Sequence, residues 1–227
     1  MQRRTYIRLS QNLTDMEKEE ELKYIVITDK MVTVCGQSLE HEQTGAAMLS
    51  EIYRTYIGDW PKFFKMDTLS KVGYLASELL LKDLGDCRME GEECTSGRAI
   101  LLFGTTASLC ADHNYQETIQ NEDNYYPSPA LFVYTLPNIV TGEIAIRNHY
   151  RGETEFLVVE RFDAMQMAFH VQCAFQDKTT ESVLVGWIDS TDNDDFSSFF
   201  TLVDGEGAKD RGRLAQQLDE IMNNLKY

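Results

Sequence analysis

The segment SPALFVYTLPNIVTGEIAIRNHYRG, residues 128–152, decides the fold that we expect for this chain. Its first part is predicted to be extended and to end at Pro137-Asn138. A helix is predicted over residues 138–148, and a turn follows at Arg151-Gly152. The apolar run FLVV, residues 156–159, comes shortly after this turn and indicates a buried strand. Strand, helix and strand in this order are typical of a layered α/β domain.

Two other unbroken apolar runs, residues 100–103 and 183–188, predict further buried strands. Together with residues 156–159 they are expected to form the centre of a mixed sheet of roughly five strands. A hairpin is predicted over residues 24–34 and an edge strand over residues 199–203. A short first strand is expected over residues 5–9.

Several helices are predicted from capping residues and from apolar residues at helical spacing. We expect them to follow Thr44, to run from Asp67 to Gly85, to run from Asp163 to about Phe175, and to occupy residues 211–226. A polar loop is predicted over residues 86–97. Since no linker or internal repeat is visible, residues 1–227 are expected to form a single domain.

Composition narrows the class of protein. A hydrophobic content of 43% over 227 residues is typical of a globular domain. The formal charge of −16 argues against nucleic acid and anionic membrane surfaces as partners, because both require Lys and Arg to neutralise phosphate. No apolar run approaches the roughly 20 residues that span a bilayer. The N-terminus lacks the apolar segment of a secretory signal, which predicts a cytoplasmic location.

The segment 128–152 resembles the N-terminal half of the β-ketoacyl synthases, in which a similar run leads to the catalytic cysteine. The resemblance is carried by Pro137, Asn138, Gly142 and Gly152. Three further segments resemble the same family in the same order: residues 65–71, 102–106 and 183–189. The resemblance implies an α/β fold, namely a layered α-β-α domain like half of a thiolase fold.

The nucleophile of that family is missing from the matching position. The family's cysteine stands nine residues after the turn glycine, and 152 + 9 gives Arg161 in this chain. The neighbours Glu160 and Phe162 cannot form a thioester either. The family's two catalytic histidines belong to a C-terminal half for which this chain is too short. The resemblance therefore implies a vestigial nucleophile position at Glu160, Arg161 and Phe162, with no catalytic residue, cofactor or metal.

These features imply a non-catalytic, chain-length-factor-like subunit. It would pair with an active β-ketoacyl-ACP synthase in polyketide, aryl-polyene-type or fatty-acid-type lipid biosynthesis, and would contact acyl carrier protein only indirectly. Two alternatives stay open. The chain could be a stand-alone 3-oxoacyl-ACP synthase-like acyltransferase that uses an unrecognised cysteine, or an acyl- or carrier-binding protein.

Association is expected because the family's N-terminal half buries one face against its C-terminal half. This chain must cover that face with its own hairpin at residues 24–34 and its C-terminal helix, or with another chain. The family also pairs the strand before the nucleophile across its dimer, and here that strand holds Phe156, Leu157, Val158 and Val159. We expect a homodimer in isolation and a heterodimer with a ketosynthase.

Other reactive side chains have structural interpretations. Cys110 and Cys173 are the candidate nucleophiles, but no motif places a base beside either, and Cys173 is expected to lie on a core-facing helix. Arg161 is either an ion-pair anchor, for Glu160 or for a partner carboxylate, or a side chain that reaches solvent. The acidic group Asp189, Asp192, Asp194 and Asp195 lacks the glycine and glutamate of a calcium-binding EF-hand loop. A solvated loop is expected there.

Overall fold

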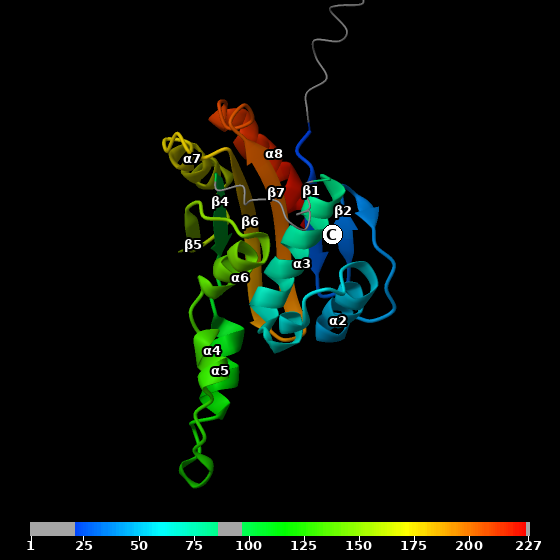
Figure 1. The fold of residues 1–227 in the computed structure, drawn as a ribbon, viewed down its shortest axis with the longest axis vertical. Helices are drawn as coiled ribbons and strands as arrows, with labels where there is room; N and C mark the ends of the chain where they lie inside the picture. Colours follow the sequence, from blue (N-terminus) through cyan, green and yellow to red (C-terminus); the bar gives the residue numbers. More distant parts are fainter. Residues whose placement is uncertain (1–20, 86–96, 226–227) are drawn as a thin grey trace, which may run out of the picture.

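The computed structural model describes residues 21–85 and 97–225. They form a mixed sheet with helices on both faces, as Figure 1 shows, which confirms the expected layered α-β-α fold. The strands are β1 (Tyr24–Thr28), β2 (Val32–Val34), β3 (Gln37–Ser38), β4 (Arg98–Gly104), β5 (Thr154–Val158), β6 (Ser182–Asp192) and β7 (Asp195–Asp204). The helices are α2 (Gly45–Tyr56), η1 (Pro61–Lys65), α3 (Thr68–Asp83), α4 (Leu109–Glu117), η2 (Glu122–Asn124), α5 (Pro129–Val133), α6 (Ile139–Asn148), α7 (Ala164–Ala174) and α8 (Arg211–Leu225).

The described sheet has seven strands in the order β3-β2-β1-β7-β6-β4-β5. Strand β4 pairs in parallel with both β5 and β6, and the other pairs are antiparallel. The expectation of roughly five strands was too low. The predicted hairpin joins the same sheet because β1 pairs with β7, and a turn at Cys35-Gly36 adds β3.

Two strands lie elsewhere in the sheet than predicted. Residues 156–159 were expected at the centre, but β5 is an edge strand, paired to β4 alone within the described sheet. Residues 199–203 were expected at the edge, but β7 lies between β1 and β6. Both errors have one cause, since an apolar run shows that a strand is covered without showing which strands flank it. The predicted central runs 100–103 and 183–188 are confirmed and fully buried.

Helix starts were predicted well where the cap is local. The carboxylates of Asp67 and Asp163 accept hydrogen bonds from the N–H groups of Ser70 and Gln166, as expected of N-caps. Thr44 also precedes a helix, but its side chain makes no capping bond. The expected first strand at residues 5–9 and the loop at residues 86–96 lie outside the described residues.

The first part of the opening segment is helical rather than extended. The Ser128 hydroxyl accepts a hydrogen bond from the N–H of Leu131, and Pro129 occupies the first turn of α5. Helices α4 and α5 and the residues between them form a hairpin, which we call the arm (residues 109–136). Figure 1 shows the arm extending beyond the end of the sheet.

The chain covers both faces of the sheet with its own helices. Helices α2, α3 and α6 pack on one face, and α7 and α8 pack on the other. Leu214, Leu218 and Ile221 of α8 are buried against this second face. The C-terminal helix therefore provides the cover expected of it, whereas the hairpin at residues 24–34 widens the sheet instead. No helix in the described part of the chain is both long and apolar enough to cross a membrane.

This packing predicts a large stability cost for truncation on the inner side of α8. Leu218→Ala should lower the free energy of unfolding by about 2–5 kcal/mol, because it leaves a cavity against the sheet. Asp219→Ala, on the exposed side of the same helix, should change it by less than about 0.5 kcal/mol. Urea unfolding followed by circular dichroism would measure both. Equal effects of the two substitutions would contradict the role given to α8.

Candidate functional site

The turn between β5 and α7 holds the three residues at the expected nucleophile position. The N–H of Val159 donates to the carbonyl of Gly104 over 3.0 Å, which places the turn at the carboxyl end of β4. Glu160 and Arg161 are exposed, and no ion pair joins them. Phe162 is half-buried, with its ring centroid 5.4 Å from that of Trp187. The side chains of Glu160 and Arg161 thus point outward from the turn, and the aromatic rings of Phe162 and Trp187 lie beneath them.

The family-like residues differ in what the structure requires of them. A Cβ on Gly152 would lie 2.2 Å from the carbonyl oxygen of Arg98, so only glycine allows the chain to pass β4 at this point. A Cβ on Gly142 would meet open space. Pro137 and Asn138 precede α6, and the Asn138 carbonyl accepts a hydrogen bond from the Thr141 hydroxyl. Close backbone approach therefore explains Gly152 but not Gly142.

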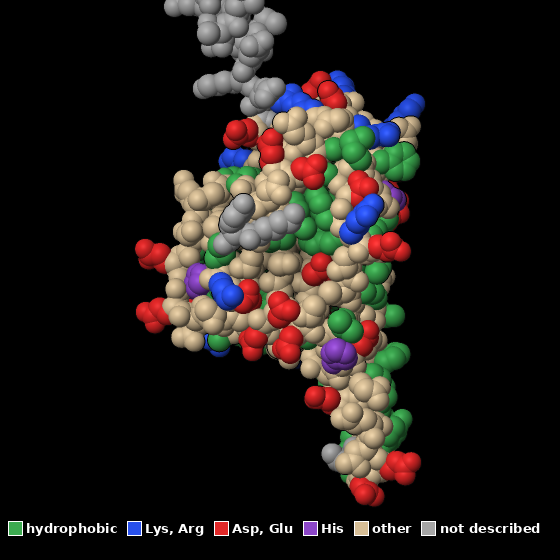
Figure 2. Space-filling view, turned by 180° about the vertical axis from the view of Figure 1, so that it is seen from behind, with side chains coloured by type: hydrophobic (Ala, Val, Ile, Leu, Met, Phe, Trp, Pro, Cys, Tyr) green, Lys and Arg blue, Asp and Glu red, His purple; other side chains and the backbone are tan. Residues whose placement is uncertain are grey.

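Strand β5 has an apolar outer border. Val158 is 56% exposed, while Phe156, Leu157 and Val159 are half-buried. On helix α7, Met165 and Phe169 are both about half exposed, and the Phe169 ring also contacts Arg211 of α8. Figure 2 shows hydrophobic side chains gathered along one side of the molecule and along the arm. An unpaired strand edge with apolar neighbours is a typical surface for association with another chain.

The two candidate cysteines lie in different environments. Cys110 is buried, 3.5 Å from the amide oxygen of Asn193 and 3.8 Å from the amide nitrogen of Asn114. Burial raises the pKa of its thiol, which disfavours the reactive thiolate. Cys173 lies on α7, which packs on the sheet as expected, but α7 buries Val171 and Ala174 and turns Cys173 outward, so this thiol is exposed. Neither thiol contacts a histidine in the described residues.

Asp192, Asp194 and Asp195, where β6 turns into β7, are exposed as expected of a solvated loop, whereas Asp189 is half-buried within β6. The Asp189 carboxylate accepts hydrogen bonds from the N–H groups of Thr105 and Thr106, at 2.6 and 2.8 Å. The Asp194 carboxylate accepts one from the N–H of Ala46, at the start of α2. These contacts join elements far apart in the sequence, and residue spacing gave no sign of them. Within residues 21–85 and 97–225, no three metal-ligating side chains converge to hold an ion.

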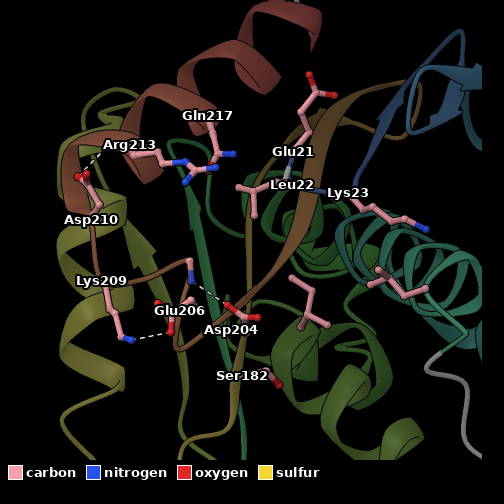
Figure 3. Close-up of a pocket in the computed structure, with 13 residues that line it drawn as sticks. Glu21, Leu22, Lys23, Ser182, Asp204, Glu206, Lys209, Asp210, Arg213 and Gln217 are labelled. Atoms are coloured by element: carbon pink, nitrogen blue, oxygen red, sulfur yellow. Dashed lines mark hydrogen bonds and ion pairs between the residues drawn. The ribbon is translucent and has the colours of Figure 1, made fainter. Parts of the chain in front are cut away.

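A cavity of about 580 Å³ lies near the amino end of α8, at the other end of the sheet from the β5–α7 turn (Figure 3). Most of its charged side chains already form ion pairs or hydrogen bonds with nearby groups. Lys209 forms an ion pair with Glu206, and Asp204 accepts a hydrogen bond from the N–H of Gly207. The Asp210 carboxylate caps α8 through the N–H of Arg213. The cavity therefore has no convergent set of free polar groups that would select a ligand.

No protein-family model matches the sequence, and no curated protein matches it either. Solved structures do match the fold. The ishigamide ketosynthase/chain length factor superimposes with a TM-score of 0.59 at 13% identity, over 83% of this chain and 63% of that chain. The ketosynthase ApeO in complex with its chain length factor ApeC, from Xenorhabdus doucetiae, gives 0.50 at 12% identity, over 82% of this chain and 80% of that chain.

A third match is AntDE:AntF, a type II PKS acyl-carrier protein in complex with its ketosynthase. It has a TM-score of 0.51 at 14% identity, over 85% of this chain and 65% of that chain. The chain thus spans less than two thirds of the first and third of these chains. At such identities the likeness concerns the fold alone. The chain has the thiolase-like fold of ketosynthases and chain length factors.

The environments of the cysteines predict their reactivity. With iodoacetamide at pH 7.5, Cys35 and Cys173 should be alkylated readily, because both thiols are exposed. Cys110 should react at least about tenfold more slowly than Cys173, because burial raises its pKa and limits access. Peptide mass mapping over time separates each cysteine from the others. Rapid alkylation of Cys110, or its acylation by an acyl-carrier thioester, would favour the acyltransferase alternative.

Proposed function

We propose that this chain is a non-catalytic, chain-length-factor-like subunit that pairs with an active β-ketoacyl-ACP synthase. The pathway would make a polyketide, an aryl-polyene-type lipid or a fatty-acid-type lipid. The observation that carries the proposal is the fold of a condensing enzyme with Arg161 at the position expected for its nucleophile. An exposed guanidinium cannot attack a thioester at neutral pH, because it stays protonated.

The open edge of β5 supports pairing with another subunit. Strand β5 offers five residues of backbone and the half-exposed side chain of Val158. Leaving such an edge unpaired favours non-specific association, so a dedicated partner is the simplest physical reason for it. One of the similar structures is a ketosynthase in complex with its chain length factor, which supports a ketosynthase as that partner.

The charge of the chain supports a subunit that acyl carrier protein contacts only indirectly. Carrier proteins are generally acidic, and this chain has a formal charge of −16. Two acidic surfaces repel one another at physiological ionic strength, whereas a more basic ketosynthase would attract both. In isolation the same β5 edge would pair two copies of this chain.

A charge introduced on the β5 edge should prevent pairing. When the chain is co-expressed with a complete ketosynthase from the same genome, Val158→Asp should abolish co-purification, because it places a carboxylate among apolar contacts. Phe64→Asp is the matched control. Phe64 is 47% exposed, but it packs against Tyr53 of α2, beside the opposite half of the sheet. Its complex should persist.

Sedimentation of the purified chain provides the second measurement. The wild-type chain should sediment as a dimer at micromolar concentration, and Val158→Asp should sediment as a monomer with an unchanged circular dichroism spectrum. A wild-type monomer that also fails to co-purify with any complete ketosynthase would contradict the partner proposal.

A further inference from the structure

The arm exposes more apolar surface than its own fold requires. Residues of α5 and of the segments on either side of it carry large apolar side chains that are about one third to three quarters exposed: Tyr125, Tyr126, Leu131, Phe132, Val133 and Leu136. Figure 2 shows hydrophobic side chains along one side of the arm. Inside the arm, the rings of Tyr115 and Phe132 pack 5.3 Å apart, so the hairpin is closed even though its outer side is apolar.

The arm is also uniformly acidic. No Lys or Arg occurs between Arg98 and Arg147, a stretch that includes the entire arm. The arm itself carries four exposed carboxylates: Asp112, Glu117, Glu122 and Asp123. With no neighbouring cation within the arm, these carboxylates are available to a basic partner surface. A second arm, which carries the same charges, would be repelled by them.

The entry to the arm is fixed by one carboxylate. Asp189, near the end of β6, accepts hydrogen bonds from the N–H groups and the hydroxyls of both Thr105 and Thr106. The Thr106 hydroxyl in turn accepts one from the N–H of Ser190. A Cβ on Gly104 would lie 2.2 Å from the carbonyl of Ile188, so the strands approach this closely only because residue 104 is glycine. We call Asp189, Thr105 and Thr106 the Asp189 clamp.

The exit of the arm is tied to its entry. The hydroxyl of Ser108, itself buried, donates to the carbonyl of Thr135 over 2.7 Å. Ala107, between the clamp and Ser108, adopts a left-handed conformation with φ of 48°, which is unfavourable for alanine and is held by the contacts on both sides. The Asp189 clamp therefore fixes the positions of both ends of the arm relative to β6.

We propose that the arm is a recognition element, held in a fixed direction by the Asp189 clamp, that docks into an apolar groove rimmed by Lys and Arg on the ketosynthase subunit. The inference rests on the proposed function, because it takes the ketosynthase as the partner. It adds a second contact region to the β5 edge and specifies the chemistry of the surface that receives it. A pre-ordered arm loses little conformational entropy on binding, so loosening the arm weakens the complex without removing any contact.

The charge of the arm is tested on the complex with the ketosynthase that the wild-type chain co-purifies with. Replacing Glu122→Lys together with Asp123→Lys should raise the Kd about tenfold and reduce its dependence on salt concentration. The matched control is Asp219→Lys with Glu220→Lys, an adjacent and equally exposed acidic pair on α8. The control should leave the Kd within about twofold. Equal effects of the two pairs would overturn the docking of the arm.

The clamp is tested by hydrogen exchange on the free chain. Asp189→Asn should speed exchange of the Thr105 and Thr106 amides about tenfold, loosen residues 109–136 and raise the Kd for the ketosynthase. Thr105→Val removes a hydroxyl contact but keeps both amide contacts, and should give a smaller effect in the same direction. Asp204→Asn is the control and should leave exchange at Thr105 and Thr106 unchanged. The Asp204 carboxylate accepts a hydrogen bond from the N–H of Gly207, at the other end of the β6–β7 pair from Asp189.

The outcomes separate the two proposals. Unchanged exchange at Thr105 and Thr106 would overturn the clamp, and a loosened arm with an unchanged Kd would overturn the need for pre-ordering. If the wild-type chain binds the ketosynthase but the arm variants behave like their controls, the arm proposal fails and the partner proposal stands. If the wild-type chain does not bind, the partner proposal fails and the recognition role of the arm falls with it.

Discussion

Burial of β4 on both of its faces is the constraint on which the arrangement of this molecule depends. All seven residues of this strand are buried, so helices must cover the sheet from both sides. Helices α3 and α6 cover one side, and α7 alone is too narrow for the other. The end of the chain returns as α8 to complete that second layer. A domain that covers both faces of its sheet in this way has less apolar surface left to cover by association than the sequence predicts.

The end of β6 and the turn between β6 and β7 form hydrogen bonds with the segments that lead into three helices. In the turn, Asp194 accepts a hydrogen bond from the N–H of Ala46 in α2, and Asn193 accepts one from the hydroxyl of Thr68 in α3. Asp189, near the end of β6, accepts one from the N–H of Thr105 on the approach to α4. Carboxylate and amide oxygens suit this task, because the first N–H groups of a helix have no partner within the helix. The end of β6 and the turn that follows thus contact the segments at or just before the starts of three helices. The bond from the N–H of Ala46 to the Asp194 carboxylate is a helix cap of this kind.

Hydrogen bonds between residues close in the sequence could be predicted from the sequence, whereas those between distant residues could not. The caps at Asp67 and Asp163 were found because a cap and its helix are adjacent. The same signal, Ser128 followed by Pro129, was present before α5 but was interpreted as an extended segment. By contrast, 84 residues separate Thr105 from Asp189, and no spacing rule joins them. Strand order and the outward direction of Cys173 depend on tertiary packing in the same way.

The two borders of the described sheet differ in a manner that limits assembly. At one border β3 consists of two exposed residues, Gln37 and Ser38, beside a sharp turn at Cys35-Gly36. At the other, β5 offers a longer and more apolar strand. A subunit that can extend its sheet at one border only adds a single neighbour and then stops, since the added neighbour leaves no new border of the same kind. If β5 pairs as proposed, growth by strand pairing would therefore stop after one added neighbour, and the β5 edge would not seed a fibre.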